Sequence, residues 1–403
     1  MAESPVDTTR STKWRRSTRS WLLRLTTVSH CSSGEGRTAS VVVPTYREAP
    51  NLRALATRVS AAMTVGGWTW ELLLVDDDSG DGSVEIANDL AERLPLRMEV
   101  RRGVPRDLSR AVLHGIRQAR FDRIVVMDAD LSHPPERIPD LLNALDGCAD
   151  IVVGSRYAPG GEVDRNWGAW RHLNSRLATL LARSLVNCSD PMAGFFAVDR
   201  NKLPGPGQLH PLGYKIALEL MVRGRLRIAE VPIVFSDRQR GVSKLDWRQQ
   251  VNYLRHVHRL YLFRYGGLAR LASFLCVGAS GFLIDVAFYL GLQWFGLEHR
   301  LARFLSFWPA VTWNWRLNRA ITFAERPWRP QGRQWAQFVG SSLLGLSVNV
   351  GAYTALTSFV AFFGQNRLLA LVCGVAVGSI ANYLVANGYV YGRYRARAVD
   401  RPQ

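Results

Sequence analysis

The sequence VVMDADLSHPPE, residues 125–136, places two aspartates directly behind a short apolar run. The run from Ile124 to Met127 is apolar enough to form a buried strand, and Asp128 and Asp130 follow it. Two carboxylates at the end of a buried strand repel each other unless a cation or hydrogen-bond donors offset their charge. Mg²⁺ suits such a pair, because it takes one or two carboxylates and completes its shell with phosphate oxygens and water. The stretch therefore predicts a strand of an α/β sheet that ends in a divalent-metal site.

Similar apolar runs followed by polar residues occur on both sides of this stretch. They predict strands at Ala39–Val43, Glu71–Val75, Leu96–Arg101, Arg123–Met127, Ile151–Gly154 and Phe195–Val198. Turn residues and helix-length segments separate them, which predicts a Rossmann-like α/β domain with a mostly parallel sheet. Polar clusters follow four of these strands, at residues 44–48, 76–79, 128–130 and 155–157. Because ligands bind outside the carboxyl ends of parallel strands, the four clusters should converge on one site. The segment Asp81-Gly82-Ser83 is instead expected to form a turn or helix cap.

The 403-residue chain carries a formal net charge of +18 and five scattered cysteines. Its length exceeds that of one ordinary domain, and longer apolar stretches begin near Leu268, so at least two units are expected. The positive charge is compatible with nucleic acid, anionic lipid or phosphorylated substrates. Nucleic acid is the least favoured partner, because many basic residues lie near the expected membrane segments and phosphate site. The cysteines show no CxxC spacing, which argues against a zinc site or a disulfide framework and fits a reducing compartment.

Residues 40–244 contain eight ordered blocks that carry a family resemblance. The blocks are VVVPTYREAPNL (41–52), LLVDDDSGDGS (73–83), DLSRAVLHG (107–115), VVMDADLSHPPE (125–136), VVGSRYAPGG (152–161), DPMAGFFAV (190–198), GYKIALEL (213–220) and R-x-x-G-x-S-K (238–244). With them the chain resembles the dolichol-phosphate mannose synthases and related polyprenyl-phosphate glycosyltransferases of glycosyltransferase family 2, which have the GT-A fold. The resemblance implies a catalytic domain over residues 38–244.

The resemblance also implies roles for individual residues. The donor's base and ribose would be held by Pro44, Tyr46, Glu48, Val75 and Asp77. Asp128 and Asp130 would bind Mg²⁺ or Mn²⁺, with Ala129 lining the same nucleotide-sugar pocket. The donor phosphates would lie near Arg156, Arg238 and Lys244, and the lipid phosphate near Arg171 and Ser175. Three positions differ from the family pattern, namely Arg47 for the usual Asn, Ser132 for a Gln and Asp107 for a Gly. These differences bear on donor preference and loop mobility.

The expected reaction transfers a hexose to a polyprenyl phosphate with inversion. Mannose from GDP-mannose is favoured by the resemblance, and glucose from a UDP-sugar is the alternative. A phosphate acceptor is already an anion, so its attack needs little help from a general base. His133 is therefore expected to be structural, and Asp128, Asp130, Arg238 and Lys244 are expected to stabilise the departing diphosphate. A non-catalytic carrier or flippase of lipid-linked sugar is the competing class, and the intact metal pair favours the enzyme.

Four apolar segments after the catalytic domain predict a membrane domain over residues 268–393. They are Leu268–Phe295, Leu301–Phe323, Gln337–Phe363 and Leu368–Tyr391. The second segment is the weakest, because Arg303, Pro309 and Arg316 interrupt it. At an offset of 64 residues the second pair of segments resembles the first, with Phe274 matching Phe338, Gly281 Gly345, Asp285 Asn349, Arg303 Arg367 and Asn318 Asn382. This indicates a tandem repeat of two helix pairs, and the region resembles the GtrA-like membrane domain.

The remaining segments set the expected orientation in a bilayer. Arginines follow the second and fourth segments, at residues 326, 329, 333, 393, 395 and 397, so these sides and the catalytic domain are expected to be cytosolic. Residues 245–267 are expected to form an amphipathic interfacial helix whose apolar stripe contains Trp247, Val251, Leu254, His258 and Tyr261. The ends, residues 1–37 and 394–403, are expected to be a disordered tail and a basic tail. Asp285 is a candidate functional residue with Arg319 as its expected partner, or a helix-packing residue.

Overall fold

The computed structural model of the protein describes residues 36–147, 149–163, 169–210, 213, 215–236, 247–326 and 330–392. The chain divides into two compact units, Met1–Arg264 and Tyr265–Gln403. The first unit has two hydrophobic cores and the second has one. The expected terminal tails lie outside the described residues, apart from Gly36 and Arg37.

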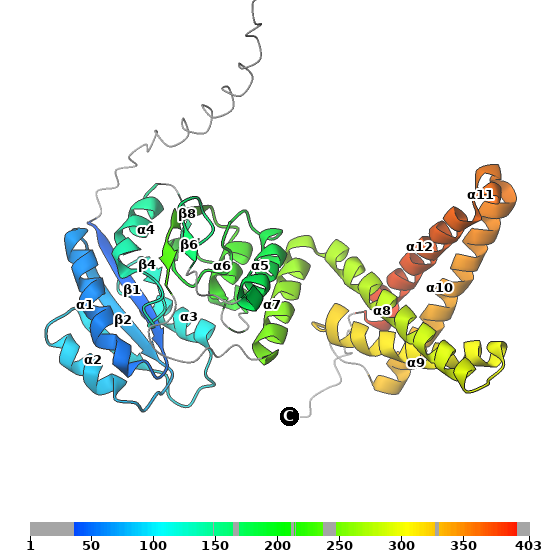
Figure 1. Cartoon of the computed structure of the whole chain (residues 1–403), viewed down its shortest axis with the longest axis horizontal. Helices are drawn as coiled ribbons and strands as arrows, with labels where there is room; N and C mark the ends of the chain where they lie inside the picture. The colour runs from blue at the N-terminus through cyan, green and yellow to red at the C-terminus, as the bar shows by residue number, and fades with distance from the viewer. Residues whose placement is uncertain are drawn as a thin grey trace, which may run out of the picture. The chain divides into compact units, whose positions relative to one another are not determined.

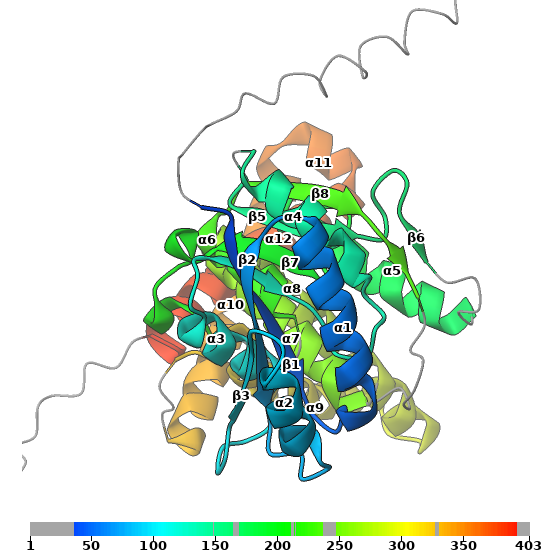
Figure 2. The same ribbon diagram turned by 90° about the vertical axis from the view of Figure 1, so that its left-hand side faces the viewer.

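The first unit is built around a seven-stranded sheet with the order β3-β2-β1-β4-β7-β5-β8 (Figures 1 and 2). Neighbouring strands are parallel, except that β7 is antiparallel to both β4 and β5. The strands are β1 (Thr38–Thr45), β2 (Thr69–Asp76), β3 (Leu96–Val100), β4 (Arg123–Val126), β5 (Ile151–Ser155), β7 (Phe196–Asp199) and β8 (Ile228–Pro232). A separate parallel pair consists of β6 (Glu162–Val163) and β9 (Val234–Phe235). The mostly parallel α/β sheet is confirmed, and each of the six expected strands is present within two residues of its expected ends.

Helices cover both faces of the sheet. One face carries α1 (Ala49–Val65), α2 (Ser83–Ala91) and α4 (Ile138–Leu145). The other carries α3 (Leu108–Gln118), α5 (Ala169–Arg183), α6 (Ile216–Gly224) and α7 (Trp247–Tyr265). Val41 and Val43 of β1 point to the first face and Val42 to the second, as the alternation of a strand requires. In α3, Gly115 allows close packing, because a Cβ there would lie 2.3 Å from Val42 Cγ1.

Helix α7 packs on the rest of the first unit through a stripe that the sequence did not indicate. Tyr253, Val257 and Leu260 are buried in the core beneath α5 and α6. The Tyr253 hydroxyl donates a hydrogen bond to the Ala178 carbonyl at 2.6 Å. Leu254, from the expected apolar stripe, is 54% exposed. The residues of the expected stripe lie mainly on the less buried side of α7. Their contact with a lipid headgroup layer remains a prediction.

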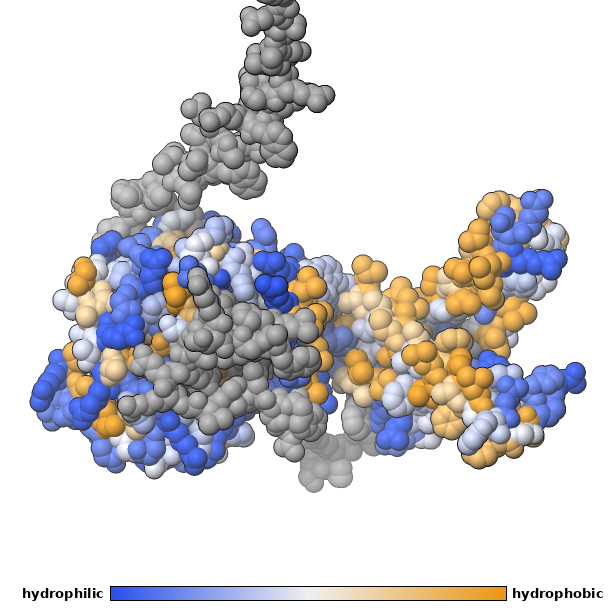
Figure 3. Space-filling view, in the orientation of Figure 1, coloured by the Kyte–Doolittle hydropathy of each residue, from blue (hydrophilic) through white to orange (hydrophobic). Residues whose placement is uncertain are grey.

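The second unit consists of long apolar helices (Figures 1 and 3). They are α8 (Gly267–Trp294), α9 (His299–Leu317), α10 (Gln331–Phe359), the short α11 (Ala361–Gln365) and α12 (Arg367–Val385), and π-helical turns follow α9 and α12. By length and composition, three described helical segments are able to cross a membrane: Gly267–Trp294, Gln331–Phe359 and Arg367–Val390. Helix α9 does not meet this criterion, since it carries charged residues, and it contains Pro309. Orange apolar surface dominates these helices in Figure 3.

The two helix pairs repeat, but with two different offsets. Helices α8 and α10 begin at Gly267 and Gln331, which gives the expected offset of 64 residues. Helices α9 and α12 begin at His299 and Arg367, which gives an offset of 68 residues. The single offset of 64 is therefore wrong for the second helix of each pair, because α12 begins 36 residues after the start of α10 whereas α9 begins 32 residues after the start of α8.

Glycine contacts support the corrected alignment. A Cβ on Gly281 would lie 2.1 Å from Asn314 Oδ1, and a Cβ on Gly345 would lie 2.8 Å from Asn382 Cβ. Asn314 and Asn382 thus occupy equivalent positions, and the expected pairing of Asn318 with Asn382 is corrected. The expected match of Arg303 with Arg367 fails for the same reason. Contacts deep in a helix pair fix the alignment better than residue identity does, because small residues set how closely the helices approach.

Asp285 on α8 is buried against α9. Its carboxylate accepts a hydrogen bond from the Ser306 hydroxyl at 2.7 Å and pairs with the Arg303 guanidinium. The expected partner, Arg319, instead donates to the Gln334 side chain at 2.7 Å. The Arg319 hypothesis is therefore wrong, and the contacts of Asp285 join α8 to α9 as in the helix-packing alternative.

Candidate functional site

The loops after β1 and β2 are tied together by Asp76, a residue that the sequence placed in a polar cluster without a role. Its carboxylate is buried and accepts hydrogen bonds from Thr45 Oγ1 at 2.9 Å and from the backbone N–H of Ser79 at 2.7 Å. The Ser79 hydroxyl in turn accepts a hydrogen bond from the backbone N–H of Arg47 at 2.8 Å. Arg47 has a φ of 59°, a left-handed conformation that asparagine adopts more readily than arginine. The Asp76 side chain therefore fixes the loops that carry the expected nucleotide-binding residues.

Asp77 is held at the same edge of the sheet by the segment that follows β3. Arg101 donates to Asp77 Oδ1 at 2.7 Å, and the backbone N–H of Asp107 donates to Oδ2 at 3.0 Å. Burial raises the pKa of Asp77, while the Asp107 N–H and the Arg101 charge act in the opposite direction. Both ion-pair side chains are about one-tenth exposed or less, at 9% for Arg101 and 8% for Asp77. The sequence did not single out Arg101, because only the fold brings it to Asp77.

The other expected donor-binding residues lie at the same strand ends. Pro44 and Val75 are paired across β1 and β2. The guanidinium of Arg106 lies 4.3 Å from the ring centroid of Tyr46, a cation–π distance. Glu48 is the N-cap residue of α1. Its carboxylate accepts a hydrogen bond from the side-chain amide of Asn51, in the first turn of that helix, at 2.7 Å. The structure thus places these four residues at or just after the ends of β1 and β2, and their contact with a nucleotide remains a prediction.

Asp81-Gly82-Ser83 forms the expected turn. Asp81 accepts hydrogen bonds from the Ser83 hydroxyl at 2.6 Å and from the backbone N–H of Ala49 at 3.1 Å. These contacts and the backbone bond from Ser83 hold the pKa of Asp81 below its ordinary value, although burial acts in the opposite direction. The turn therefore joins the start of α2 to the start of α1.

Asp128, Ala129 and Asp130 follow β4 after a single residue, Met127. Asp130 is buried and accepts a hydrogen bond from the backbone N–H of Ser132 at 3.1 Å, while the Asp128 side chain is 37% exposed. Leu131 has a φ of 62°, so the chain turns sharply behind the pair. Among the described residues no group of three or more His, Cys, Asp or Glu side chains is placed to hold a metal. Two carboxylates of this kind fit Mg²⁺ or Mn²⁺ when phosphate oxygens and water supply the other ligands.

His133 is placed as a support for this turn. Its Nδ1 accepts a hydrogen bond from the backbone N–H of Asp128 at 3.2 Å, so the neutral ring carries its proton on Nε2. The ring is stacked on Phe195 with centroids 5.3 Å apart. Burial lowers the pKa of His133, although the carboxylates of Asp128 and Asp130 act in the opposite direction. A buried, neutral and stacked imidazole agrees with the expected structural role.

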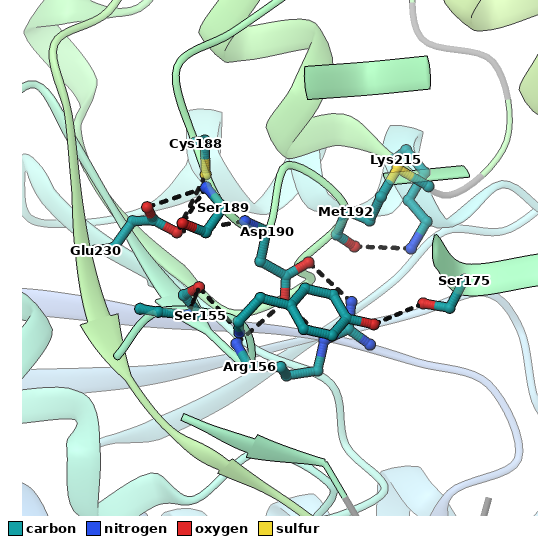
Figure 4. Close-up of polar contacts among 11 residues, drawn as sticks. Ser155, Arg156, Ser175, Cys188, Ser189, Asp190, Met192, Lys215 and Glu230 are labelled. Atoms are coloured by element: carbon teal, nitrogen blue, oxygen red, sulfur yellow. Dashed lines mark hydrogen bonds and ion pairs between the residues drawn. The ribbon is translucent and has the colours of Figure 1, made fainter. Parts of the chain in front are cut away.

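Arg156, just after β5, is paired with Asp190 (Figure 4). Its Nε and Nη2 donate to the two carboxylate oxygens at 2.7 and 2.9 Å, and its backbone N–H donates to Oδ2 at 3.2 Å. Burial alone would raise the pKa of Asp190, but the hydrogen bonds and charge of Arg156 outweigh it, so this pKa lies below its ordinary value. The backbone N–H of Asp190 donates a hydrogen bond to the carboxylate of Glu230, on β8, at 3.3 Å.

The segment after Asp190 brings a second cation and a close approach to Asp128. Lys215, which precedes α6, donates from Nζ to the Met192 carbonyl at 2.8 Å. Burial and the Arg156 charge lower the pKa of Lys215 to about 8, while Asp190 and Asp128 act in the opposite direction. A Cβ on Gly194 would lie 3.3 Å from Asp128 Oδ2, so glycine permits this segment to approach the expected metal site. Asp190 and Lys215 lie within the sequence blocks 190–198 and 213–220, but no role was predicted for either residue.

The expected lipid-phosphate residues lie on α5. Ser175 forms a hydrogen bond with the Tyr157 hydroxyl at 3.0 Å, which joins α5 to the loop after β5 (Figure 4). Arg171 belongs to the same helix one turn earlier. Arg238 and Lys244 lie outside the described residues, so their proximity to the donor phosphates remains a prediction. Among the described residues, Ser175 therefore contacts Tyr157, which follows Arg156 in the chain.

Comparison with known proteins agrees with this architecture. Residues 40–203 match Glycosyl transferase family 2, and residues 273–391 match the GtrA/DPMS transmembrane domain. A dolichol-phosphate mannosyltransferase from Pyrococcus furiosus is 34% identical over 351 residues, covering 86% of this chain and 97% of the relative. One from Mycosarcoma maydis is 42% identical over 244 residues, covering 58% of this chain and 83% of the relative. A glucosyl-3-phosphoglycerate synthase structure from Mycobacterium tuberculosis, with Mn²⁺, UDP-glucose and phosphoglyceric acid, has a TM-score of 0.42 at 21% identity and covers 57% of this chain and 80% of its own.

The match to the first relative extends through both units and nearly the whole of that relative. Asp128, Asp130 and the loops at the described strand ends lie within the region that matches the glycosyltransferase family, and most of the apolar helices lie within the region that matches the transmembrane domain. The chain is therefore a glycosyltransferase of family 2 with a GtrA/DPMS transmembrane domain, and it belongs with the dolichol-phosphate mannosyltransferases.

Proposed function

We propose that the protein transfers mannose from GDP-mannose to a polyprenyl phosphate. The observation that carries this proposal is the position of Arg156, which is anchored on buried Asp190 and lies close enough to Asp128 to feel its charge. Such a site suits a reaction between two phosphate-bearing substrates, because cations between them reduce their repulsion. The names of the similar mannosyltransferases support mannose and a polyprenol acceptor.

Asp128 and Asp130 would hold a divalent cation, Mg²⁺ or Mn²⁺, on the donor diphosphate. When bound, the cation would stabilise the negative charge that develops on the departing diphosphate. Pro44, Tyr46, Glu48, Val75, Asp77 and Ala129 would hold the nucleotide. Arg156, Arg238 and Lys244 would bind its phosphates, and Arg171 and Ser175 would bind the lipid phosphate. The strand-end positions of Asp77 and Asp128 support one continuous donor site.

The acceptor attacks in a single displacement. A phosphate oxygen of the polyprenyl phosphate forms a bond to the anomeric carbon, the bond from that carbon to the donor diphosphate breaks, and GDP leaves with the bonding pair. The configuration at the anomeric carbon is therefore inverted. The acceptor oxygen is already an anion at neutral pH, so the protein aligns the substrates and screens charge rather than removing a proton.

The site would work at the cytosolic membrane surface. The three apolar helical segments of membrane-spanning length support a multi-pass protein, and the arginines after the second and fourth segments support cytosolic placement of that side. Helix α9 would be the fourth span, because it occupies the position of α12 in the helix-pair repeat. This topology would bring a bilayer-embedded acceptor to the catalytic unit.

The test uses membranes that contain the full chain. With labelled GDP-mannose and Mg²⁺ they should form a product that is extracted into organic solvent and released by mild acid. Asp130→Asn should abolish the product, and Asp140→Asn should not, since the half-exposed Asp140 side chain pairs with Arg137 on the surface of α4. Labelled product that persists in Asp130→Asn would refute the metal role.

Two alternatives have distinct outcomes in the same assay. A UDP-glucose-dependent enzyme would form labelled product only from UDP-glucose in a panel of donors. A carrier would bind lipid-linked sugar without forming it from any donor. Chelation with EDTA followed by separate addition of Mg²⁺ and Mn²⁺ would identify the metal.

A further inference from the structure

Glu230 lies on the edge strand β8, next to the strand that leads to Arg156. In the parallel pairing of β8 with β5, Glu230 is opposite Val153, and Arg156 follows β5 directly. Strand β8 is the last in the order of the sheet, and Glu230 is half-buried. A carboxylate that gives up part of its water loses free energy unless hydrogen-bond donors replace that water. The donors around Glu230 therefore explain why an acidic residue stands at this position.

The Glu230 carboxylate holds the turn that leads into Asp190 (Figure 4). The backbone N–H of Ser189 is shared between its two oxygens at 3.0 Å each, and the N–H of Asp190 donates to Oε1 at 3.3 Å. The Cys188 thiol donates to the same oxygen at 3.5 Å. Burial and the Glu230 charge raise the pKa of Cys188, so its thiol remains a donor at neutral pH. Glu230 thus binds three successive residues to β8.

The turn that Glu230 holds supplies the anchor of Arg156. The Asp190 side chain is 0% exposed and binds the guanidinium through two hydrogen bonds, at 2.7 and 2.9 Å. A guanidinium bound at two points has a fixed direction, so a shift of the Asp190 backbone would shift it as well. Arg156 follows β5 and Glu230 belongs to β8, and these two strands are hydrogen-bonded to each other. Both ends of the ion pair are therefore tied to the same part of the sheet.

We propose that Glu230 is a positioning residue for sugar transfer, which directs the Arg156 guanidinium toward the donor phosphates by fixing the turn at Ser189 and Asp190. This inference rests on the proposed function, in which Arg156 binds those phosphates. The contact of an arginine with phosphate depends strongly on direction, because its planar fork of N–H groups must meet the oxygens. Glu230 touches neither substrate in this proposal, and its effect passes through Asp190.

The test measures the binding of GDP with Mg²⁺ separately from turnover, in the purified full chain. Glu230→Ala removes the acceptor and should weaken GDP binding by about 10-fold, and kcat/KM for GDP-mannose should fall by about 10- to 100-fold. Glu230→Gln keeps one acceptor oxygen for the Ser189 N–H and should recover most of the affinity. Glu92→Ala is the control, because Glu92 is exposed at the end of α2. A GDP affinity of Glu230→Ala within twofold of wild type would overturn the proposal.

A second measurement asks whether Glu230 acts through Arg156. In the double variant Arg156→Met with Asp190→Asn the guanidinium is absent and no buried charge is left unpaired. Adding Glu230→Ala to this background should therefore cause no further loss of GDP affinity. A further loss as large as that in the wild-type background would overturn the proposal, since the effect would then be independent of Arg156.

A cavity beside Glu230 allows a chemical rescue. It has a volume of about 190 Å³ and is lined by Arg183, Val186, Asn187, Cys188, Ser189 and Glu230. In Glu230→Ala, added acetate should enter this space, offer a carboxylate to the Ser189 N–H and restore part of the GDP affinity, while wild type should not respond. The folded fraction is measured in the same samples. An affinity loss that disappears when only folded protein is counted would overturn the proposal. A wild-type protein that binds GDP but transfers no sugar would contradict the proposed function and leave these binding comparisons intact.

Discussion

Replacement of Asp190 by Asn should strongly destabilise the catalytic unit. The Asp190 side chain is 0% exposed and that of its partner Arg156 is 12% exposed. Removing one charge of such a pair leaves the other buried without compensation, at a cost of roughly 3–5 kcal/mol. For a unit of this size each 1 kcal/mol lowers the melting temperature by about 2–4 °C, so a decrease of about 6–20 °C is expected.

The assay is thermal unfolding of the purified full chain in detergent, followed by tryptophan fluorescence at pH 7. The pH matters because the pKa of Asp190 lies below its ordinary value of 3.8 in the folded protein. A carboxyl group of this kind stabilises the fold fully above its unfolded pKa, and the stabilisation is lost only as pH falls through the folded value. Measurements at pH 7 therefore report the whole effect, and the difference between wild type and Asp190→Asn should shrink in acid.

A double variant tests whether the effect comes from the ion pair. Arg156→Met combined with Asp190→Asn removes both charges, so it should be less destabilised than the sum of the two single variants. The coupling free energy should exceed about 1 kcal/mol. Activity should remain absent in the double variant, since Arg156 is expected at the donor phosphates. The reasoning would be refuted if the losses of unfolding free energy in the two single variants simply added in the double variant. It would also be refuted if Asp190→Asn melted within about 2 °C of wild type.

Three further predictions concern other parts of the chain. Gly378→Ala should cost about 1–3 kcal/mol in detergent unfolding, because the added Cβ would lie 2.6 Å from a backbone oxygen of α10, whereas Gly351→Ala meets nothing within 4 Å and should be neutral. Arg47→Asn should raise the free energy of unfolding by up to about 1 kcal/mol, since Arg47 has a φ of 59°, while Arg102→Asn in ordinary backbone should not. Transfer activity should fall as pH rises through about 8, the pKa of Lys215, because the ammonium group loses its charge above that value, and Lys215→Arg should abolish this alkaline loss in a pH–rate profile.

The sheet was predictable because its central strands are short apolar runs bounded by polar turns. Residues 41–43 and 72–75 are almost completely buried, so their sequence has the continuous apolar character of a strand covered on both faces. The edge strand β8, Ile228–Pro232, was not expected, since it is only half-buried and contains Glu230 and Pro232. The antiparallel direction of β7 depends on where the chain returns to the sheet, which strand composition does not encode.

The site residues that could be predicted from the sequence are those that lie just after a predicted strand. Asp77, Asp128 and Arg156 all come within two residues of the end of a strand. Asp190 pairs with Arg156 across 34 positions of the chain, and Arg101 pairs with Asp77 across 24. Long-range pairs of this kind depend on how loops fold back over the sheet, so their partners were not assigned from sequence.

The helix-pair repeat shows a similar limit. Its existence followed from matched glycines and aromatic residues, but one offset was applied to both helices. The start of α10 is followed by α12 four residues later than the start of α8 is followed by α9, and this changes every assignment in the second helix of the pair. Loops accept insertions readily, whereas the contact of Gly345 with Asn382 requires a fixed alignment within the helix pair.

The protonation of the site indicates what kind of acceptor it serves. A sugar hydroxyl would need a base to remove its proton, yet His133, beside the aspartate pair, has a lowered pKa and uses Nδ1 to accept a backbone hydrogen bond. Arg156 and Lys215 instead contribute positive charge near Asp128. The buried carboxylate of Asp190 holds the Arg156 guanidinium in place through an ion pair. Cations do little for a neutral hydroxyl but lower the repulsion between an anionic acceptor and a diphosphate donor. The described side chains therefore favour a phosphate over a hydroxyl as the attacking group, in agreement with a lipid phosphate delivered from the membrane.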